Sequence, residues 1–283
     1  MDAALETPAP PDPPELPDGI QRRPAWPWWF ALVGFLVGIA ATLLLVAIFG
    51  GVLAAVTGAK SNSPGFIVLG TIVQGLAFGA TALFFASRVA RPKAWHFGLG
   101  RAQFWPTVGW ATLGIGAFYV LTIIYGLLVK PSAEQNTVQE LGGNSGTFGL
   151  IVAGVMVIAV APVIEEFFFR GFFYRALRSR LSWIAAALVD GLLFGSIHYS
   201  GNGVDGLLIL PPLAILGVIF CLVYERTGTL LAPIGMHALN NTIAFAAQAH
   251  GGWQVSVVVG PLMLGAVVLT GRRLAPAPRL SSA

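Results

Sequence analysis

The chain has 283 residues, of which 56% are hydrophobic and 10% are charged, and its net charge at neutral pH is +4. Soluble domains carry about a quarter charged residues, so this composition excludes an ordinary soluble protein and predicts a chain that resides in lipid. The basic residues are scattered between apolar segments, which argues against a nucleic-acid partner, and the single cysteine, Cys221, allows no internal disulfide.

Proline and acidic residues dominate the first 25 residues, which lack the basic start of a signal peptide and precede an apolar run longer than a signal-peptide core. We predict that residues 1–25 form a disordered cytoplasmic tail. Residues 26–271 are predicted to form a single transmembrane domain, and residues 272–283 a short basic cytoplasmic tail.

Charge-free runs of about 20 residues, the length that spans the hydrocarbon core as a helix, recur along residues 26–271. The predicted fold class is therefore all-α, a polytopic transmembrane bundle of about eight membrane helices held together by helix packing. The predicted helices are Trp28–Val56, Phe66–Ser87, Trp105–Val129, Phe148–Phe169, Trp183–His198, Leu207–Tyr224, Leu230–Ala249 and Val255–Thr270.

The Lys and Arg residues test this helix count, because retained basic residues mark cytoplasmic loops. If the N-terminus is inside, the segments on the opposite side retain only Lys60 and Lys130. Both termini are therefore predicted to be cytoplasmic, and we expect the membrane to be a bacterial cell membrane. The basic residues on the predicted cytoplasmic side are Arg22, Arg23, Arg88, Arg91, Lys93, Arg101, Arg170, Arg175, Arg178, Arg180, Arg226, Arg272, Arg273 and Arg279.

Ionisable side chains inside a membrane cost about 3 kcal/mol each, so those within the predicted helices require an explanation. In the fourth helix, Arg170 follows Glu166 by four residues, a spacing that allows an ion pair on one helix face. A structural ion pair at the helix end would explain these two residues on their own. It would not explain Glu165, because a second carboxylate beside the first adds repulsion unless it faces a polar cavity.

In the fifth helix, His198 follows Glu165 by 33 residues, and the midpoint of that interval falls near Leu181, where a turn is expected. Residues equidistant from the turn of a helical hairpin lie at the same depth, here about 24 Å from the turn, so Glu165 and His198 can face each other. A structural, hydrogen-bonding histidine is the alternative interpretation. The same hairpin geometry places Asp190 at the depth of Arg170 to Arg175, where it is predicted to form a structural ion pair.

The seventh helix places His237 and Asn241 four residues apart on one face, with Asn240 offset around the helix. Hydrogen bonds between helices would explain such residues without any catalytic role. An imidazole and an amide on one helix face also suit a site that stabilises an oxyanion.

Three short motifs lie in order on the fourth, fifth and seventh predicted helices, EEFFFR at 165–170, FGSIH at 194–198 and HALNN at 237–241. They match EExxxR, FxxxH and HxxxN, the pattern of the CAAX-processing and bacteriocin-processing peptidases, with every signature position present. The chain resembles this family over about residues 148–249. The resemblance implies an all-helical intramembrane endopeptidase, similar to the type II CAAX prenyl endopeptidases, with a site that opens toward the cytoplasmic half of the membrane.

The resemblance also assigns roles to four residues of the fourth and fifth helices. Glu165 would be the general base that activates a water molecule, and His198 would share that water. Glu166 and Arg170 would hold the charge geometry of the site. A positioned base of this kind contributes about 10² to 10⁴ in rate.

His237 and Asn241 would, by the same resemblance, donate hydrogen bonds to the oxyanion of the tetrahedral intermediate. This assignment requires no metal and no other cofactor. The implied partners are the lipid bilayer and a membrane-associated peptide or protein substrate, for which a prenylated CAAX protein is one candidate.

Two alternatives stay open. A zinc ion held by Glu165, His198 and His237 would make the chain a zinc-dependent protease of the same family, although the HExxH spacing is absent and Arg170 would oppose a dication. In a different class, a non-enzymatic transporter or bacteriocin-immunity protein could use the same intramembrane charges as a proton or substrate path.

Overall fold

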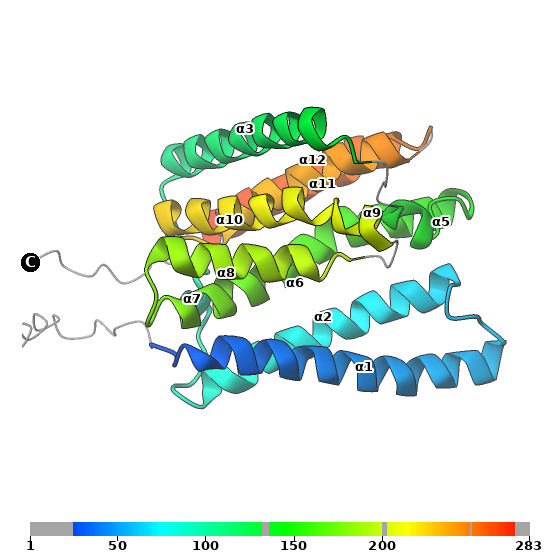
Figure 1. Cartoon of the computed structure of the whole chain (residues 1–283), viewed down its shortest axis with the longest axis horizontal. Helices are drawn as coiled ribbons and strands as arrows, with labels where there is room; N and C mark the ends of the chain where they lie inside the picture. The colour runs from blue at the N-terminus through cyan, green and yellow to red at the C-terminus, as the bar shows by residue number, and fades with distance from the viewer. Residues whose placement is uncertain (1–24, 132–135, 200–202, 250, 275–283) are drawn as a thin grey trace, which may run out of the picture.

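The structure is a computed structural model that describes residues 25–131, 136–199, 203–249 and 251–274 of the chain (Figure 1). These described residues form helices and no strand, which confirms the predicted all-α class. The predicted N-terminal tail lies outside them, except for its last residue. The elements are α1 (Trp29–Thr57), α2 (Pro64–Ser87), η1 (Ala94–Phe97), α3 (Phe104–Val129), α4 (Thr137–Glu140), α5 (Gly146–Val155), η2 (Met156–Val160), α6 (Ala161–Glu166), η3 (Phe167–Phe173), α7 (Tyr174–Leu177), α8 (Trp183–Ser196), α9 (Gly203–Leu207), α10 (Leu210–Thr227), α11 (Leu231–Gln248) and α12 (Gln254–Arg273).

Six helical segments of the described chain are long and apolar enough to cross a membrane, so the protein is a polytopic integral membrane protein. A shorter apolar helix, α8, and the polar-faced α11 occupy the positions of the fifth and seventh predicted helices. The structure thus has a helix at each of the eight predicted positions. The number of helices that span the bilayer stays a prediction. The six spanning candidates are Trp29–Thr57, Pro64–Ser87, Phe104–Val129, Gly146–Leu177, Gly203–Thr227 and Gln254–Arg273.

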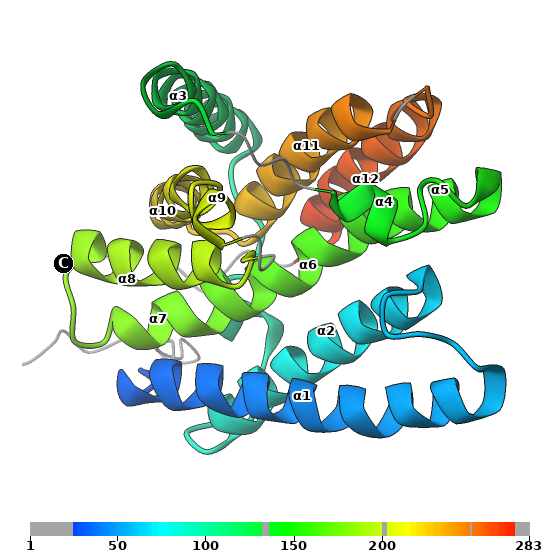
Figure 2. The same cartoon turned by 45° about the vertical axis from the view of Figure 1, so that its right-hand side comes forward.

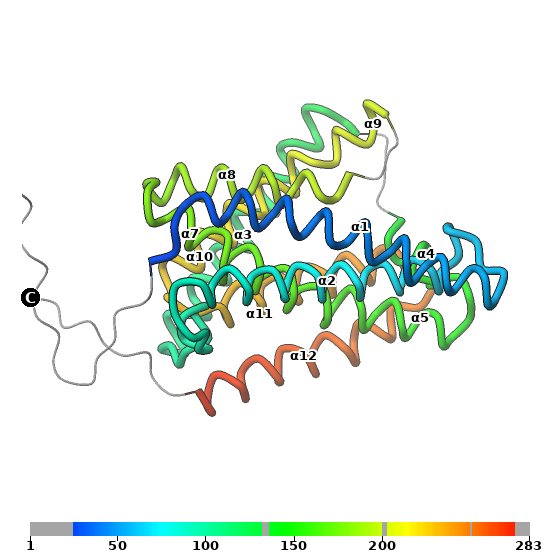
Figure 3. The backbone as a smooth tube through the Cα atoms, turned by 90° about the horizontal axis from the view of Figure 1, so that it is seen from below, coloured from blue at the N-terminus to red at the C-terminus, as the bar shows by residue number. Residues whose placement is uncertain are grey.

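The elements from α5 to α7 follow one another without a break and form a single long helix of 32 residues, Gly146–Leu177 (Figures 1 and 2). The α1–α2 hairpin packs against one side of this helix, while α8 and α10 lie on another side, with α3 beyond α10. Helices α11 and α12 pack together and contact η2, the middle of the long helix (Figure 3). The long helix therefore lies between the N-terminal hairpin and the remaining helices.

The long helix differs from the predicted fourth helix, which was expected to end at Phe169. It continues to Leu177, and Arg170 within it is fully buried and ion-paired with Glu166 and Asp190. Two of its segments, η2 and η3, have π-helical hydrogen bonding, in which each N–H bonds five residues back. The last helix also runs past its predicted end, through Arg273 instead of Thr270.

Close contacts of the N-terminal hairpin depend on glycine. A Cβ on Gly34 would lie 2.9 Å from the Phe172 ring of η3, and one on Gly38 would lie 2.9 Å from the Phe78 ring of α2. Each glycine therefore accepts an aromatic side chain against its backbone, as small residues do where membrane helices approach closely. These contacts hold α1 against both η3 and α2.

One end of the bundle gathers basic residues. The start of α1, the ends of α2, α7, α10 and α12 and the start of α3 all lie at this end (Figure 1). Arg88, Arg178 and Arg226 lie there, whereas Lys60 and Lys130 follow the opposite ends of α1 and α3. This separation agrees with the predicted topology, and the side of the membrane that each end faces stays a prediction.

Candidate active site

The long helix supplies two adjacent carboxylates in different surroundings. Glu166 is fully buried, and its Oε1 atom lies 3.0 Å from Nη1 of Arg170, so the predicted ion pair is confirmed. Glu165 leaves about a quarter of its side chain exposed, at 24%. Glu165, which the ion pair predicted from the sequence did not explain, is therefore the accessible carboxylate of the two.

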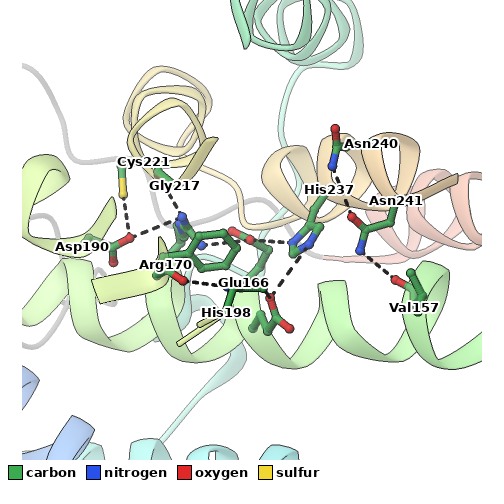
Figure 4. A network of polar contacts seen from close by, with 12 residues as sticks. Val157, Glu166, Arg170, Asp190, His198, Gly217, Cys221, His237, Asn240 and Asn241 are labelled. Atoms are coloured by element: carbon green, nitrogen blue, oxygen red, sulfur yellow. Dashed lines mark hydrogen bonds and ion pairs between the residues drawn. The ribbon is translucent and has the colours of Figure 1, made fainter. Parts of the chain in front are cut away.

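Arg170 is held by more than Glu166. Its Nη2 atom lies 3.4 Å from Oδ1 of Asp190 and donates to the backbone carbonyl of Gly217 at 2.9 Å. The guanidinium also lies over the Phe194 ring, 4.5 Å from its centroid. The predicted ion pair of Asp190 is confirmed, and the buried Arg170 charge is paired with two carboxylates and a backbone carbonyl, while its Nε atom has no hydrogen-bond partner among the described residues (Figure 4).

His237 of α11 is oriented by the same acidic residue. Its Nδ1 atom lies 2.9 Å from Oε1 of Glu166, and its ring stacks on Phe220 at a centroid distance of 4.9 Å. A carboxylate that is ion-paired with Arg170 accepts hydrogen bonds, so the His237 Nδ1–H donates to it. The other ring nitrogen, Nε2, is thereby directed toward Glu165, whose Oε2 atom lies 3.9 Å away.

His198 lies in the turn that follows α8, because this helix ends at Ser196 and not at His198 as predicted. Its Nδ1 atom lies 2.8 Å from the carbonyl oxygen of Phe194. A carbonyl oxygen only accepts, so Nδ1 carries the hydrogen and Nε2 is left free. That Nε2 atom lies 4.0 Å from Oε2 of Glu165, so the predicted facing of the two residues across the hairpin is confirmed.

Glu165 thus faces two imidazole nitrogens that point at one of its oxygens. The separations of 3.9 Å and 4.0 Å are too long for direct hydrogen bonds, and Oε2 has no hydrogen-bond partner among the described residues. One water molecule, which bonds at about 2.8 Å, can bridge atoms at this spacing. A water has two hydrogens, so it can donate to Glu165 and to one Nε2 atom at a time, and the geometry fits a water held between the carboxylate and the two rings.

Asn241 has a structural partner in the long helix. Its Nδ2 atom donates to the carbonyl oxygen of Val157 at 2.8 Å. Val157 lies in η2, where the five-residue register would pair its carbonyl with the backbone nitrogen of residue 162, but Pro162 has no N–H. Asn241 therefore satisfies a carbonyl that the helix leaves unpaired, and its predicted oxyanion role stays a prediction (Figure 4).

The neighbouring Asn240 extends this connection to α3. Its Nδ2 atom donates to Oδ1 of Asn241 at 3.3 Å, and its Oδ1 atom accepts from the hydroxyl of Tyr119 at 3.2 Å. The three side chains link α3, α11 and η2. Sequence reasoning assigned no role to Tyr119, which lies in a helix read only as an apolar span.

A cavity adjoins Glu165 on the side of the N-terminal hairpin. It offers about 50 Å³ of water-sized space, enough for more than one water molecule, and it is bounded by α2 and the long helix. Gln74 of α2 lines it together with Glu165. The sequence does carry a signal for Gln74, a single amide in the middle of an apolar segment, but sequence reasoning missed it.

The same side chains can be tested as a metal site. Two imidazole nitrogens and a carboxylate are of the right kind for zinc. However, tetrahedral ligands bonded at about 2.0 to 2.1 Å lie about 3.4 Å apart, closer than the atoms of Glu165 and the two rings. Within the described residues, no group of three or more His, Cys, Asp or Glu side chains has a spacing that could hold a metal ion.

A family model described as "Type II CAAX prenyl endopeptidase Rce1-like" matches residues 147–243. This region contains all three motifs and spans the long helix through most of α11. The predicted resemblance to CAAX-processing peptidases is therefore confirmed over this part of the chain. No solved structure matches the chain.

Individual relatives agree with this match. The "Uncharacterized 24.3 kDa protein" of Escherichia coli is 28% identical over 138 residues, which cover 48% of this chain and 62% of that protein. The "Putative membrane peptidase YdiL" of Bacillus subtilis is 26% identical over 113 residues, 37% of this chain and 44% of that protein. A third relative, the "Uncharacterized protein YyaK" of Bacillus subtilis, is 26% identical over 142 residues, 47% of this chain and 46% of its own length. The chain spans only about half the length of these relatives.

Proposed function

We propose that this chain, which matches the Rce1-like type II CAAX prenyl endopeptidases over residues 147–243, is an intramembrane endopeptidase that uses Glu165 to activate water. The observation that carries the proposal is the approach of two imidazole Nε2 atoms to Oε2 of Glu165, at 3.9 Å and 4.0 Å. Hydrolysis needs a base in contact with water and groups that hold the water in place, and this arrangement supplies both.

In the proposed reaction, the Glu165 carboxylate removes a proton from the bridging water. The resulting hydroxide attacks the carbonyl carbon of the scissile peptide bond, and the carbonyl oxygen becomes the oxyanion of a tetrahedral intermediate. Collapse of the intermediate breaks the C–N bond, and the proton taken up by Glu165 passes to the leaving amine. The products are a carboxylic acid and an amine, which ionise at neutral pH to a carboxylate and an ammonium group, with no net change at Glu165.

His237 is the better placed of the two predicted oxyanion donors. Its Nδ1–H is committed to Glu166, so donation to an oxyanion comes from Nε2 when the ring carries a second proton, with Glu166 as counter-ion. Asn241 donates one amide hydrogen to the carbonyl oxygen of Val157, and its second amide hydrogen can be donated to an oxyanion. His198 keeps Nε2 free through its bond to Phe194 and acts on the water.

We propose that the substrate is a membrane-associated peptide or protein, with a prenylated CAAX protein as one candidate, and that the membrane is a bacterial cell membrane. Glu165 lies 12 residues before the end of the long helix at Leu177, which corresponds to about 18 Å along the helix axis. That end belongs to the basic end of the bundle. Under the predicted topology, the site therefore lies within the cytoplasmic half or near the middle of the membrane.

The test is a cleavage assay on purified protein in vesicles, with a farnesylated CAAX peptide and an unprenylated transmembrane peptide as probes. Wild type should cleave at least one probe, and Glu165→Gln should reduce its rate by about 10² to 10⁴. Glu140→Gln is the matched control, because this exposed carboxylate in α4 receives the same chemical change outside the site. Cleavage by neither wild type nor variant would favour a transporter or an immunity protein.

Zinc dependence is the competing mechanism and needs its own measurement. We derive no step through a metal, because the ligand spacing in the described residues does not fit one. Elemental analysis of the active, purified protein, before and after dialysis against a chelator, separates the two mechanisms. One bound zinc per chain whose removal stops cleavage, and whose return restores it, would overturn the metal-free proposal.

A further inference from the structure

Gln74 is an uncharged polar side chain placed where lipid offers it no partner. It lies 10 residues after the start of α2 at Pro64 and 13 before its end at Ser87, about 15 Å and 20 Å from the two ends. No hydrogen bond joins its amide to another described residue, although interhelical hydrogen bonds are the usual reason for an amide in a membrane helix. Packing of α2 therefore does not explain it.

The face of α2 that carries Gln74 lines the cavity beside Glu165. Thr71, Gln74, Gly75 and Phe78 recur at the three- and four-residue spacing of one helix face, and all four bound this cavity. The hydroxyl of Thr71 donates to the carbonyl oxygen of Ile67 in its own helix, at 3.0 Å. Among the described lining residues, Gln74 is thus the one whose side chain can both donate to and accept from an incoming molecule, while Thr71 and the Glu165 carboxylate can accept.

A peptide bond is cleaved in an extended segment, so a substrate must bring unpaired backbone N–H and C=O groups into the cavity. Each such group costs free energy in an apolar site unless it finds a partner. A glutamine amide is both a donor and an acceptor, and can bond the N–H and C=O of one residue in an extended segment, because these two groups point to the same side of the strand. Its chemistry fits a peptide backbone, whatever the side chains of the substrate are.

We infer that Gln74 binds the backbone of the substrate next to the scissile bond and holds an extended, non-helical segment against Glu165. This inference rests on the proposed function, and it adds a substrate-binding residue from outside the 147–243 match. Gln74 acts on the position of the substrate and takes no part in proton transfer. Its loss therefore weakens binding and leaves the chemical step nearly unchanged.

The test measures binding in a Glu165→Gln background, so that the probe is not consumed. The probe is the farnesylated CAAX peptide with a fluorophore, titrated into protein reconstituted in phosphatidylethanolamine and phosphatidylglycerol vesicles. Gln74→Leu should weaken binding by about five- to tenfold, the effect of one or two lost hydrogen bonds. Leu76→Ala, on the exposed side of the same helix, is the control and should bind like the background protein.

Misfolding is separated from lost recognition in two ways. Leucine is favoured over glutamine in a membrane helix, so Gln74→Leu should keep or raise the midpoint of thermal unfolding. A set of probes, each with one backbone N–H methylated, supplies the second control. The probe that loses affinity for Gln74 protein should lose no further affinity for the Gln74→Leu protein, because the same hydrogen bond is missing in both.

Three results overturn the inference: equal affinity of Gln74→Leu and the background protein, additive losses for every methylated probe, or no saturable binding of the farnesylated peptide. The proposed function is judged separately by cleavage. If Gln74-dependent binding is found and wild type cleaves neither the farnesylated peptide nor the unprenylated transmembrane peptide, the endopeptidase proposal fails while the binding role of Gln74 stands.

Discussion

Oε1 of Glu166 lies 2.9 Å from Nδ1 of His237 and 3.0 Å from Nη1 of Arg170, so one buried oxygen joins the acidic motif to the histidine of α11. This contact determines which ring nitrogen of His237 faces Glu165. It also distinguishes the two adjacent glutamates, because Glu166 is buried and orients His237, whereas Glu165 is partly exposed and is the proposed base.

The first prediction contrasts these two glutamates. Glu166→Gln should lower the free energy of unfolding by about 3 kcal/mol, because Arg170 loses the charge of a buried partner, and cleavage should fall with it. Glu165→Gln should lose activity while its unfolding midpoint stays close to wild type, because Glu165 is partly exposed and makes no short ion pair. Thermal unfolding in detergent, measured beside cleavage, checks both variants. Equal destabilisation by the two substitutions would contradict this division of roles.

The second prediction concerns Asp190, the second acidic partner of Arg170. Asp190→Asn should destabilise the protein less than Glu166→Gln does, because its ion pair is longer, at 3.4 Å, and Arg170 keeps Glu166 and the Gly217 carbonyl. Cleavage should persist within about tenfold, since Asp190 contacts neither Glu165 nor an imidazole. Unfolding and turnover of Asp190→Asn and Glu166→Gln, measured side by side, test the order. A complete loss of turnover in well-folded Asp190→Asn would assign this residue a larger role.

The sequence was sufficient for those parts of the site that depend on regular helix geometry. The Glu166–Arg170 ion pair follows from a spacing of four, and the facing of Glu165 and His198 follows from a hairpin that turns near Leu181. Both relationships need only the rise and the turn of a helix.

The sequence was insufficient where an element departs from regular geometry or where neighbouring helices decide. The π-helical segments and the position of His198 beyond the end of α8 depend on local hydrogen bonding, which the apolar pattern does not reveal. The long helix continues past Phe169 to Leu177, through charged residues that the apolar pattern does not assign to a membrane helix. Helix α2 is apolar nearly all round, so its sequence does not show that the face carrying Gln74 turns toward Glu165.

The third prediction tests the structural role of Asn241 through Pro162. Asn241→Ala leaves the Val157 carbonyl unpaired and should lower the free energy of unfolding by about 1 to 3 kcal/mol. Pro162→Ala supplies a backbone N–H that can bond this carbonyl in the five-residue register. In the Pro162→Ala background, Asn241→Ala should therefore cost less, with a coupling of about 0.5 to 1.5 kcal/mol in a double-mutant cycle.

Kinetics of the same variants separate the two possible roles of Asn241. If Asn241 is an oxyanion donor, Asn241→Ala should lower kcat by about 10² to 10³, and Pro162→Ala should not restore it. A residue that mainly positions η2 would show a smaller loss of kcat that Pro162→Ala partly restores. Purely additive effects on both stability and kcat would contradict the structural role.

The last prediction concerns the crossing of α8 and α10. A Cβ on Gly217 would lie 2.8 Å from Cα of Gly191 and 3.2 Å from Nη2 of Arg170, so Gly217→Ala must separate the two helices or displace the guanidinium. We expect a loss of about 1 to 3 kcal/mol in unfolding free energy, together with lower activity, because Arg170 positions Glu166 and through it His237. Gly51→Ala, in α1, is the matched control, because a Cβ there meets no atom within 4 Å and its stability should be unchanged or slightly raised. If Gly217→Ala unfolds and cleaves like Gly51→Ala, the close approach of α8 and α10 does not support the site.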